Sequence, residues 1–87
     1  MTPLQRKLGR HALGLRDDNK RSYRNSFVAG PKNANYAVLM RMVRDGLAKR
    51  ERFGAHPENR YVFHLTKISA EQCLDPGEAL SLEDFPH

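Results

Sequence analysis

The sequence predicts one mainly α-helical domain with a single two-stranded β-hairpin, an α+β fold. Three stretches carry helix start or stop signals, and one stretch, Leu47 to Thr66, has the pattern of two strands around a polar loop. The chain has 87 residues, so a single domain is expected. We assign it to residues 1–76 and treat residues 77–87 as an acidic C-terminal tail.

The first helix is predicted to begin after Thr2. Thr2 can cap the helix, Pro3 suits the first helical position and Gln5 completes a capping box. Gly14 is the expected stop. The expected buried stripe consists of Leu4, Leu8 and Ala12 or Leu15. Gly9 weakens such a helix by about 1 kcal/mol relative to Ala, but it allows another element to approach closely.

A short second helix is predicted from about Asn19 to Phe27. In that helix Tyr23 and Phe27 stand at i, i+4 and face the core. Gly30-Pro31 then breaks the helix, and residues 28–34 connect it to the next one. No strand is predicted between the first two helices.

The central helix is predicted to span Tyr36 to Asp45, with Asn35 as its N-cap. Its expected apolar face consists of Tyr36, Leu39, Met40 and Val43, continued by Leu47. Gly46 ends the helix because glycine takes the left-handed conformation without steric cost. Leu39 and Val43 are therefore expected in the core.

The hairpin is predicted from Leu47 to Phe53, through a loop over residues 54–59, to Tyr61 to Thr66. Strand alternation places Tyr61, Phe63 and Leu65 on one face. In the first strand Leu47 and Phe53 share a face. This strand is expected to leave the core as it approaches the tip of the hairpin.

A last short helix is predicted to start at a capping box, Ser69-Ala70-Glu71-Gln72, with Ile68, Cys73 and Leu74 available for packing. Asp75-Pro76-Gly77 ends this helix. The tail is either a frayed end or a strap laid over the body.

Charge is divided unevenly along the chain. The net charge is +5, but residues 1–52 hold thirteen Lys or Arg against four acids, whereas residues 53–87 hold two against six. A basic body with an acidic tail indicates polyanion binding, although a solvated charged surface gives the same pattern.

Composition argues against membrane and secretory classes. The longest apolar run, Tyr36 to Met40, has five residues, far below the roughly 20 that span a bilayer. The basic N-terminus is followed by no apolar segment, so a signal peptide is not expected. Cys73 is the single cysteine, which excludes an intramolecular disulfide and fits a reducing cytosol. We expect a cytoplasmic protein.

No catalytic or metal-binding constellation is apparent in the sequence. The four histidines, His11, His56, His64 and His87, are scattered, and no Cys-x-x-Cys is present. Cys73 as a nucleophile would need a nearby base and a lowered pKa, so a packing role is favoured. Gly30-Pro31-Lys32-Asn33 lacks P-loop spacing. We expect neither an enzyme nor a bound metal or cofactor.

The segments Met42 to Arg50 and Arg60 to Thr66, joined by a polar loop, resemble the second half of a winged-helix domain. In such domains a helix ends in Gly-Leu, a hairpin with a basic tip follows, and the second strand leaves through Leu-Thr into another helix. Residues 22–31 are similar to a segment of short phage and prophage proteins. The resemblance implies a winged-helix-like single domain and a small phage-type regulator that binds duplex DNA.

In winged helices the exposed face of the central helix enters the major groove, while the wing contacts phosphates or a minor groove. By resemblance the helix contacts are Arg41 and Arg44. The wing contacts are Arg50, Arg52 and Arg60, and Lys32 and Asn35 lie at the helix start. Equally, Arg41 and Arg44 can be the solvent side of an amphipathic helix.

A second hypothesis remains open, in which the chain is a phage-encoded protein-interaction module. It would then inhibit a host defence complex, in an anti-CRISPR-like manner, or a transcription complex. Two features favour it: the connection over residues 28–34 exceeds the 3–4 residues usual in a helix-turn-helix, and the first strand is missing. The charge pattern and the hairpin favour DNA.

Overall fold

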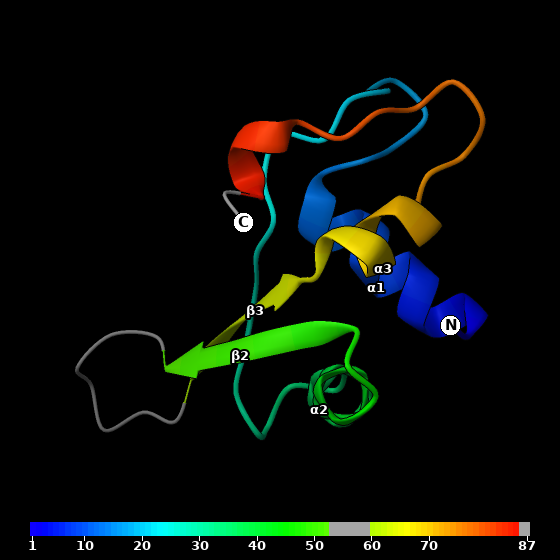
Figure 1. The fold of residues 1–87 in the computed structure, drawn as a ribbon. Helices are drawn as coiled ribbons and strands as arrows, with labels where there is room; N and C mark the ends of the chain where they lie inside the picture. The colour runs from blue at the N-terminus through cyan, green and yellow to red at the C-terminus, as the bar shows by residue number, and fades with distance from the viewer. Residues whose placement is uncertain (53–59, 86–87) are drawn as a thin grey trace.

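The computed structural model describes residues 1–52 and 60–85. Its elements are α1 (Pro3–Leu13), β1 (Phe27–Ala29), α2 (Tyr36–Arg44), β2 (Ala48–Arg52), β3 (Tyr61–Leu65), α3 (Lys67–Gln72) and the 3-10 helix η1 (Leu82–Asp84). The α+β class is therefore confirmed. Figure 1 shows α2 at one end of the molecule, with the segment between α1 and β1 and the C-terminal segment together at the other.

The sheet has three antiparallel strands in the order β1-β3-β2. The sequence predicts only two strands, and the expectation that no strand lies between the first two helices is wrong. Phe27 pairs with Phe63 and Ala29 with Tyr61. A strand of three residues carries too little alternation to be recognised locally, and its pairing with β3 defines it.

The hairpin is confirmed where the structure describes it. Phe63 and Leu65 are buried and Tyr61 is half-buried, so the predicted face of the second strand is correct. In β2 only Ala48 is buried, and Lys49 to Arg52 are exposed, in agreement with a strand that leaves the core. The predicted loop and Phe53 lie outside the described residues.

Helix α1 begins and ends at the predicted residues. The Thr2 hydroxyl accepts from the Gln5 amide at 3.1 Å, and the Gln5 side chain accepts from the Thr2 amide at 2.9 Å. This capping role holds Gln5 in a buried position, whereas Leu4, expected in the stripe, is 47% exposed. Leu8, Ala12 and Leu15 are buried as expected.

The predicted helix from Asn19 to Phe27 is absent. The segment hydrogen-bonds to the last turn of α1 instead: the Tyr23 amide donates to the Leu13 carbonyl and the Ser26 amide to the Ala12 carbonyl. The last carbonyls of a helix have no partner within the helix, so these bonds satisfy groups at the end of α1. Tyr23, expected in the core, is 58% exposed.

The predicted central helix is confirmed as α2, but its buried face is not centred on the residues that the sequence predicts. Leu39 and Met42 are buried, while Val43 is half-buried against the core cluster. Met42 lies outside the predicted face, and its burial agrees with the contact of α2 with α1 as well as with β2. The predicted stops Gly14 and Gly46 both adopt left-handed conformations, with φ of 76° and 77°.

Helix α3 begins three residues earlier than predicted. Thr66 is its N-cap, and the Thr66 hydroxyl accepts from the Ser69 amide at 3.3 Å. Ser69 is therefore inside the helix, fully buried, and its hydroxyl donates to the Leu47 carbonyl. Ile68, expected to pack, is 73% exposed, whereas Cys73 is buried.

The C-terminal segment from Glu78 to Phe85 lies against the body. Of the two alternatives for the tail, a frayed end or a strap, the described part is thus a strap. The Ser22 amide donates to the Ala79 carbonyl at 2.9 Å, and the Ala79 amide donates to the Lys20 carbonyl at 2.9 Å. The Ser81 amide donates to the Ser22 hydroxyl at 2.7 Å. We call residues 78–85 the C-terminal strap.

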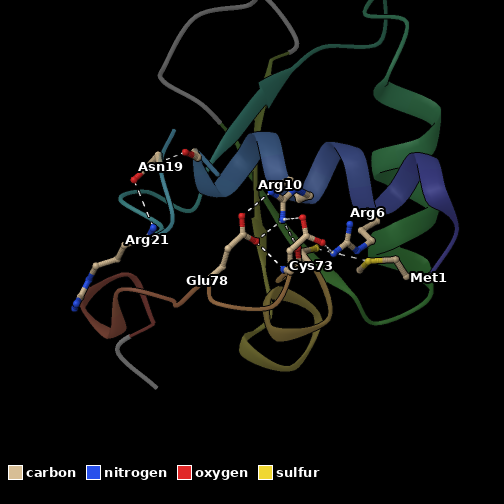
Figure 2. Close-up of polar contacts among 9 residues, drawn as sticks. Met1, Arg6, Arg10, Asn19, Arg21, Cys73 and Glu78 are labelled. Atoms are coloured by element: carbon tan, nitrogen blue, oxygen red, sulfur yellow. Dashed lines mark hydrogen bonds and ion pairs between the residues drawn. The ribbon is translucent and has the colours of Figure 1, made fainter. Parts of the chain in front are cut away.

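An ion pair between Arg10 and Glu78 fixes the start of this strap (Figure 2). Arg10 bonds Glu78 through two nitrogens, with Nη2 to Oε2 at 2.8 Å, and Arg10 Nη1 also donates to the Cys73 carbonyl at 2.8 Å. The Glu78 side chain is 1% exposed. The hydrogen bonds from Arg10 hold the pKa of Glu78 at about 2, below its usual 4.5.

Acid should weaken the fold through Glu78. Because its carboxyl has a folded pKa of about 2 and an ordinary value near 4.5, its contribution is fully present above about pH 5. The contribution is lost as pH falls toward 2. Glu78→Gln should lower the free energy of unfolding at pH 7 and should flatten its decline below pH 5, as measured by urea unfolding. Glu71→Gln, at an exposed position on α3, should keep the parent's decline, and an equal decline in all three proteins would contradict the assignment.

Gly9 should resist substitution by Ala although it lies inside a helix. Helix propensity alone favours Ala by about 1 kcal/mol. A Cβ at Gly9, however, would lie 2.5 Å from the Cys73 sulfur, so Gly9→Ala should cost about 1–3 kcal/mol. In a double-mutant cycle Cys73→Ala should cost less in the Gly9→Ala background than in the parent. A higher melting temperature for Gly9→Ala would contradict this packing.

Candidate nucleic-acid interface

Arg50 joins the hairpin to α2. Strand register places Arg50 opposite Phe63, so its side chain shares the face of the sheet that α2 covers. Arg50 Nη1 lies 3.2 Å from the Tyr36 hydroxyl and 3.4 Å from the Met40 sulfur. Its guanidinium lies 4.2 Å from the centroid of the Tyr61 ring. These contacts fix one positive charge between the helix and the sheet.

Arg44 continues the row of α2 that Arg50 contacts. Tyr36, Met40 and Arg44 are spaced at i, i+4 and i+8, and residues at this spacing lie on one side of a helix. Arg41 lies on the adjacent, solvent side of the same helix. Helical spacing thus places Arg44 one turn beyond Met40 on the side of α2 that Arg50 contacts, with Arg41 on the adjacent side.

Both helix arginines are exposed and share one local carboxylate. Their side chains are 67% and 68% exposed, and Asp45 lies 4.0 Å from Arg41 Nε and 3.6 Å from Arg44 Nε. Exposed pairs of this kind contribute about 0–1 kcal/mol. A phosphate can therefore replace Asp45 as the partner at small cost.

The hairpin divides the remaining predicted contacts between its two faces. Arg52 stands opposite Tyr61 and two residues after Arg50, so it shares the Arg50 face. Arg60 is exposed and comes directly before β3, where alternation assigns it to the opposite face, with Val62. Both arginines lie at the open end of the described strands.

Lys32 and Asn35 lie where the chain enters α2. The Asn33 amide donates to the Gly30 carbonyl, which closes a turn that leaves Lys32 exposed. Asn35 is the N-cap residue, but its side chain makes no capping bond, so that part of the prediction is wrong. The Asn33 side chain instead accepts from the Asn35 amide at 2.8 Å.

Two residues that the sequence did not predict at this interface are Tyr36 and Tyr61, whose rings lie 6.2 Å apart. The signal was available, because Arg50 and Tyr61 occur at positions that a two-stranded pairing places on one face. We name the set Arg41, Arg44, Arg50 and Arg52 the basic face.

The side chains considered for other chemistry are placed as follows. Cys73 is buried, and this burial raises the pKa of its thiol. His64 Nδ1 lies 2.6 Å from the Asn25 carbonyl. Across residues 1–52 and 60–85, no three His, Cys, Asp or Glu residues gather as a metal site would require. In the same residues, no helix has the length and apolar character to cross a membrane.

Comparison of the chain with protein families, with curated proteins and with solved structures finds no match in any of the three. The basic face and the hairpin are therefore interpreted from their own geometry.

Arg50 should contribute to stability, whereas Arg52 should not. Arg50→Ala removes a hydrogen bond to Tyr36 and a cation–π contact with Tyr61, so it should cost about 1 kcal/mol. That loss lowers the melting temperature of a domain of this size by about 4–8 °C. Arg52→Ala removes the same charge from the same strand face and should melt within about 1–2 °C of the parent. Equal melting temperatures for the two variants would contradict the placement of Arg50.

Proposed function

We propose that this protein binds duplex DNA through the basic face, as a small winged-helix-like regulator of the phage or prophage type. The observation that carries the proposal is the position of Arg50. Its contacts with Tyr36, Met40 and Tyr61 hold the exposed side of α2 and the hairpin as one surface. Several exposed cations gathered around one fixed charge suit a polyanion with regularly spaced charges.

Segregation of charge along the fold supports this proposal. Two acids that follow β3, Asp75 and Glu78, pair with Arg6 and Arg10 of α1. Figure 1 shows the strap at the opposite end of the molecule from α2. The acidic tail is thus partly neutralised by α1, and its described ion pairs leave the arginines of α2 and β2 unused.

The hairpin serves as the wing in this proposal, and contact with phosphates is the favoured mode of binding. Strand β1 supplies the strand whose absence argued against a winged helix. The segment 16–26 forms no helix, however, so α2 lacks the preceding helix that positions a recognition helix in a helix-turn-helix. Phosphate contacts position a protein on DNA without reading bases, and they need no such helix.

The same missing helix favours the second candidate, a module that binds a protein. The basic face would then engage an acidic surface, such as the nucleic-acid-like site of a host defence or transcription complex. Salt-dependent binding to plain duplex DNA separates the two candidates, because only the first requires it.

Removal of the two helix arginines should reduce the salt dependence of DNA binding. Each phosphate contact contributes about 0.9 to the slope of log K against log salt. Arg41→Ala with Arg44→Ala should therefore reduce the slope by roughly two. Fluorescence anisotropy with a short random-sequence duplex, measured over a series of salt concentrations, checks this.

The matched control is Arg16→Ala with Arg21→Ala, which changes the net charge by the same amount. Arg16 has a local exposed partner, Asp18 at 3.0 Å, and Arg21 bridges to the strap through its backbone. This pair should leave the slope within experimental error. Equal slopes for both double variants would reject the basic face. Absence of binding by the folded parent at low salt would reject the DNA function.

A further inference from the structure

The sheet has a second surface, on the side away from Arg50. A cavity of about 440 Å³ lies there, between the β2–β3 hairpin, the start of α3 and the C-terminal strap. Small-molecule sites in proteins occupy roughly 300–1,000 Å³. The wall residues on which the inference rests are Lys49, Glu51, His64, Lys67, Asp84 and Phe85.

One wall of the cavity holds a histidine with a fixed orientation. The Asn25 side chain bonds both the amide and the carbonyl of Leu65, at 2.8 and 3.0 Å, as a strand residue would. The Asn25 carbonyl therefore lies 2.6 Å from His64 Nδ1, and it requires a proton on that nitrogen. With Nδ1 as the donor, Nε2 of the neutral ring is an acceptor, and it suits a ligand group that donates a hydrogen bond.

Two lysines stand around this histidine. Lys49 is the direct cross-strand neighbour of His64, and Lys67 is the first residue of α3. Both lysines are exposed, and within residues 1–52 and 60–85 neither lies within 4 Å of a carboxylate. Lysine ammonium groups bind phosphate oxygens as flexible point charges.

The rest of the lining has different chemistry. Asp84 and the half-buried Phe85 come from the strap, and Glu51 lies two residues after Lys49 on the same face of β2. A simple anion would face two carboxylates here without gaining any contact from them. A ligand that also carries hydroxyl or amino donors can bond the carboxylates, and one with an aromatic ring can stack on Phe85.

We propose that this cavity binds a 5′-phosphorylated nucleotide, either free or at the end of a strand. Its phosphate lies against Lys49 and Lys67, and one of its hydroxyl or amino groups donates to His64 Nε2. Its sugar hydroxyls or exocyclic amine donate to Asp84 or Glu51, and its base stacks on Phe85. The cavity and the basic face lie on opposite faces of the sheet, so this site is separate from the proposed DNA contact.

Titration of the isotope-labelled protein followed by amide NMR tests the proposal. Adenosine 5′-monophosphate should shift the amide resonances of residues 49, 64, 67 and 85, whereas adenosine and inorganic phosphate should each bind roughly tenfold or more weakly. A 5′-phosphorylated hexanucleotide, compared with its 5′-hydroxyl form, distinguishes a strand end from a free nucleotide. Shifts by either phosphorylated ligand support the site.

Variants separate this cavity from other basic surfaces. Lys49→Gln and Lys67→Gln should each weaken binding roughly tenfold while the melting temperature is unchanged, because both side chains are exposed. Lys7→Gln, on α1, is the matched control and should bind as the parent does. Phe85→Leu should reduce the preference for nucleotide over inorganic phosphate, because it removes the stacking surface and leaves the carboxylates in place.

Three results would overturn the proposal. In the first, neither phosphorylated ligand shifts the resonances of the cavity. In the second, inorganic phosphate binds as tightly as the nucleotide, which would indicate an anion site alone. In the third, Lys49→Gln and Lys67→Gln bind as the parent does. None of these results depends on whether Arg41 and Arg44 contact DNA.

Discussion

The guanidinium of Arg10 holds together three parts of the chain that are distant in sequence. From α1 it bonds the carbonyl of Cys73, at the end of α3, and both carboxylate oxygens of Glu78, at the start of the strap. Without it the helix-terminal carbonyl would lack a partner, and the nearly buried carboxylate would keep only its hydrogen bond from the Asp75 amide. The close contact of Gly9 with Cys73 occurs one residue earlier on α1, so packing and charge pairing fix α3 at the same place.

This arrangement compensates for a small core. A chain of 87 residues buries only about 60% of the surface that its unfolded form exposes, and large apolar contacts are correspondingly few. Long charged side chains add contact area through their aliphatic stems. Arg10 does so between the helices and the strap, and Arg50 does so between α2 and the hairpin. Both arginines thus act in packing as well as in electrostatics.

Local signals predicted the fold where the determining partners are close in sequence. Thr2 and Gln5 bond each other, and Gly14 and Gly46 end helices through their own backbone conformations. The segment from Asn19 to Phe27 could not be predicted in this way, because its backbone groups bond to α1 and to the strap. Strand β1 likewise depends on β3.

The start of α3 shows how a tertiary contact decides between two candidate N-cap residues. Thr66 precedes Ser69 by three residues, and Ser69 precedes Gln72 by three, so either hydroxyl could cap a helix. The Ser69 hydroxyl instead donates to the Leu47 carbonyl at the entry to the hairpin, which buries it and leaves the cap to Thr66. For the candidate sites, sequence predicted which arginines are exposed on α2 and β2. It did not predict the fixation of Arg50, nor the cavity, because the walls of that cavity come from β2, β3, α3 and the strap.

The alternation of β2 gives one short strand two roles. Arg50 and Arg52 lie on the face toward α2, and Lys49 and Glu51 lie on the face toward the strap. An edge strand with exposed backbone groups risks pairing with another chain, and charged side chains along it oppose that association. The need for solubility would therefore by itself account for charged side chains on β2. Solubility requires no particular neighbours, however. The contacts of Arg50 with two tyrosines, and the position of Lys49 beside an oriented histidine, are what distinguish these charges from a merely solvated edge.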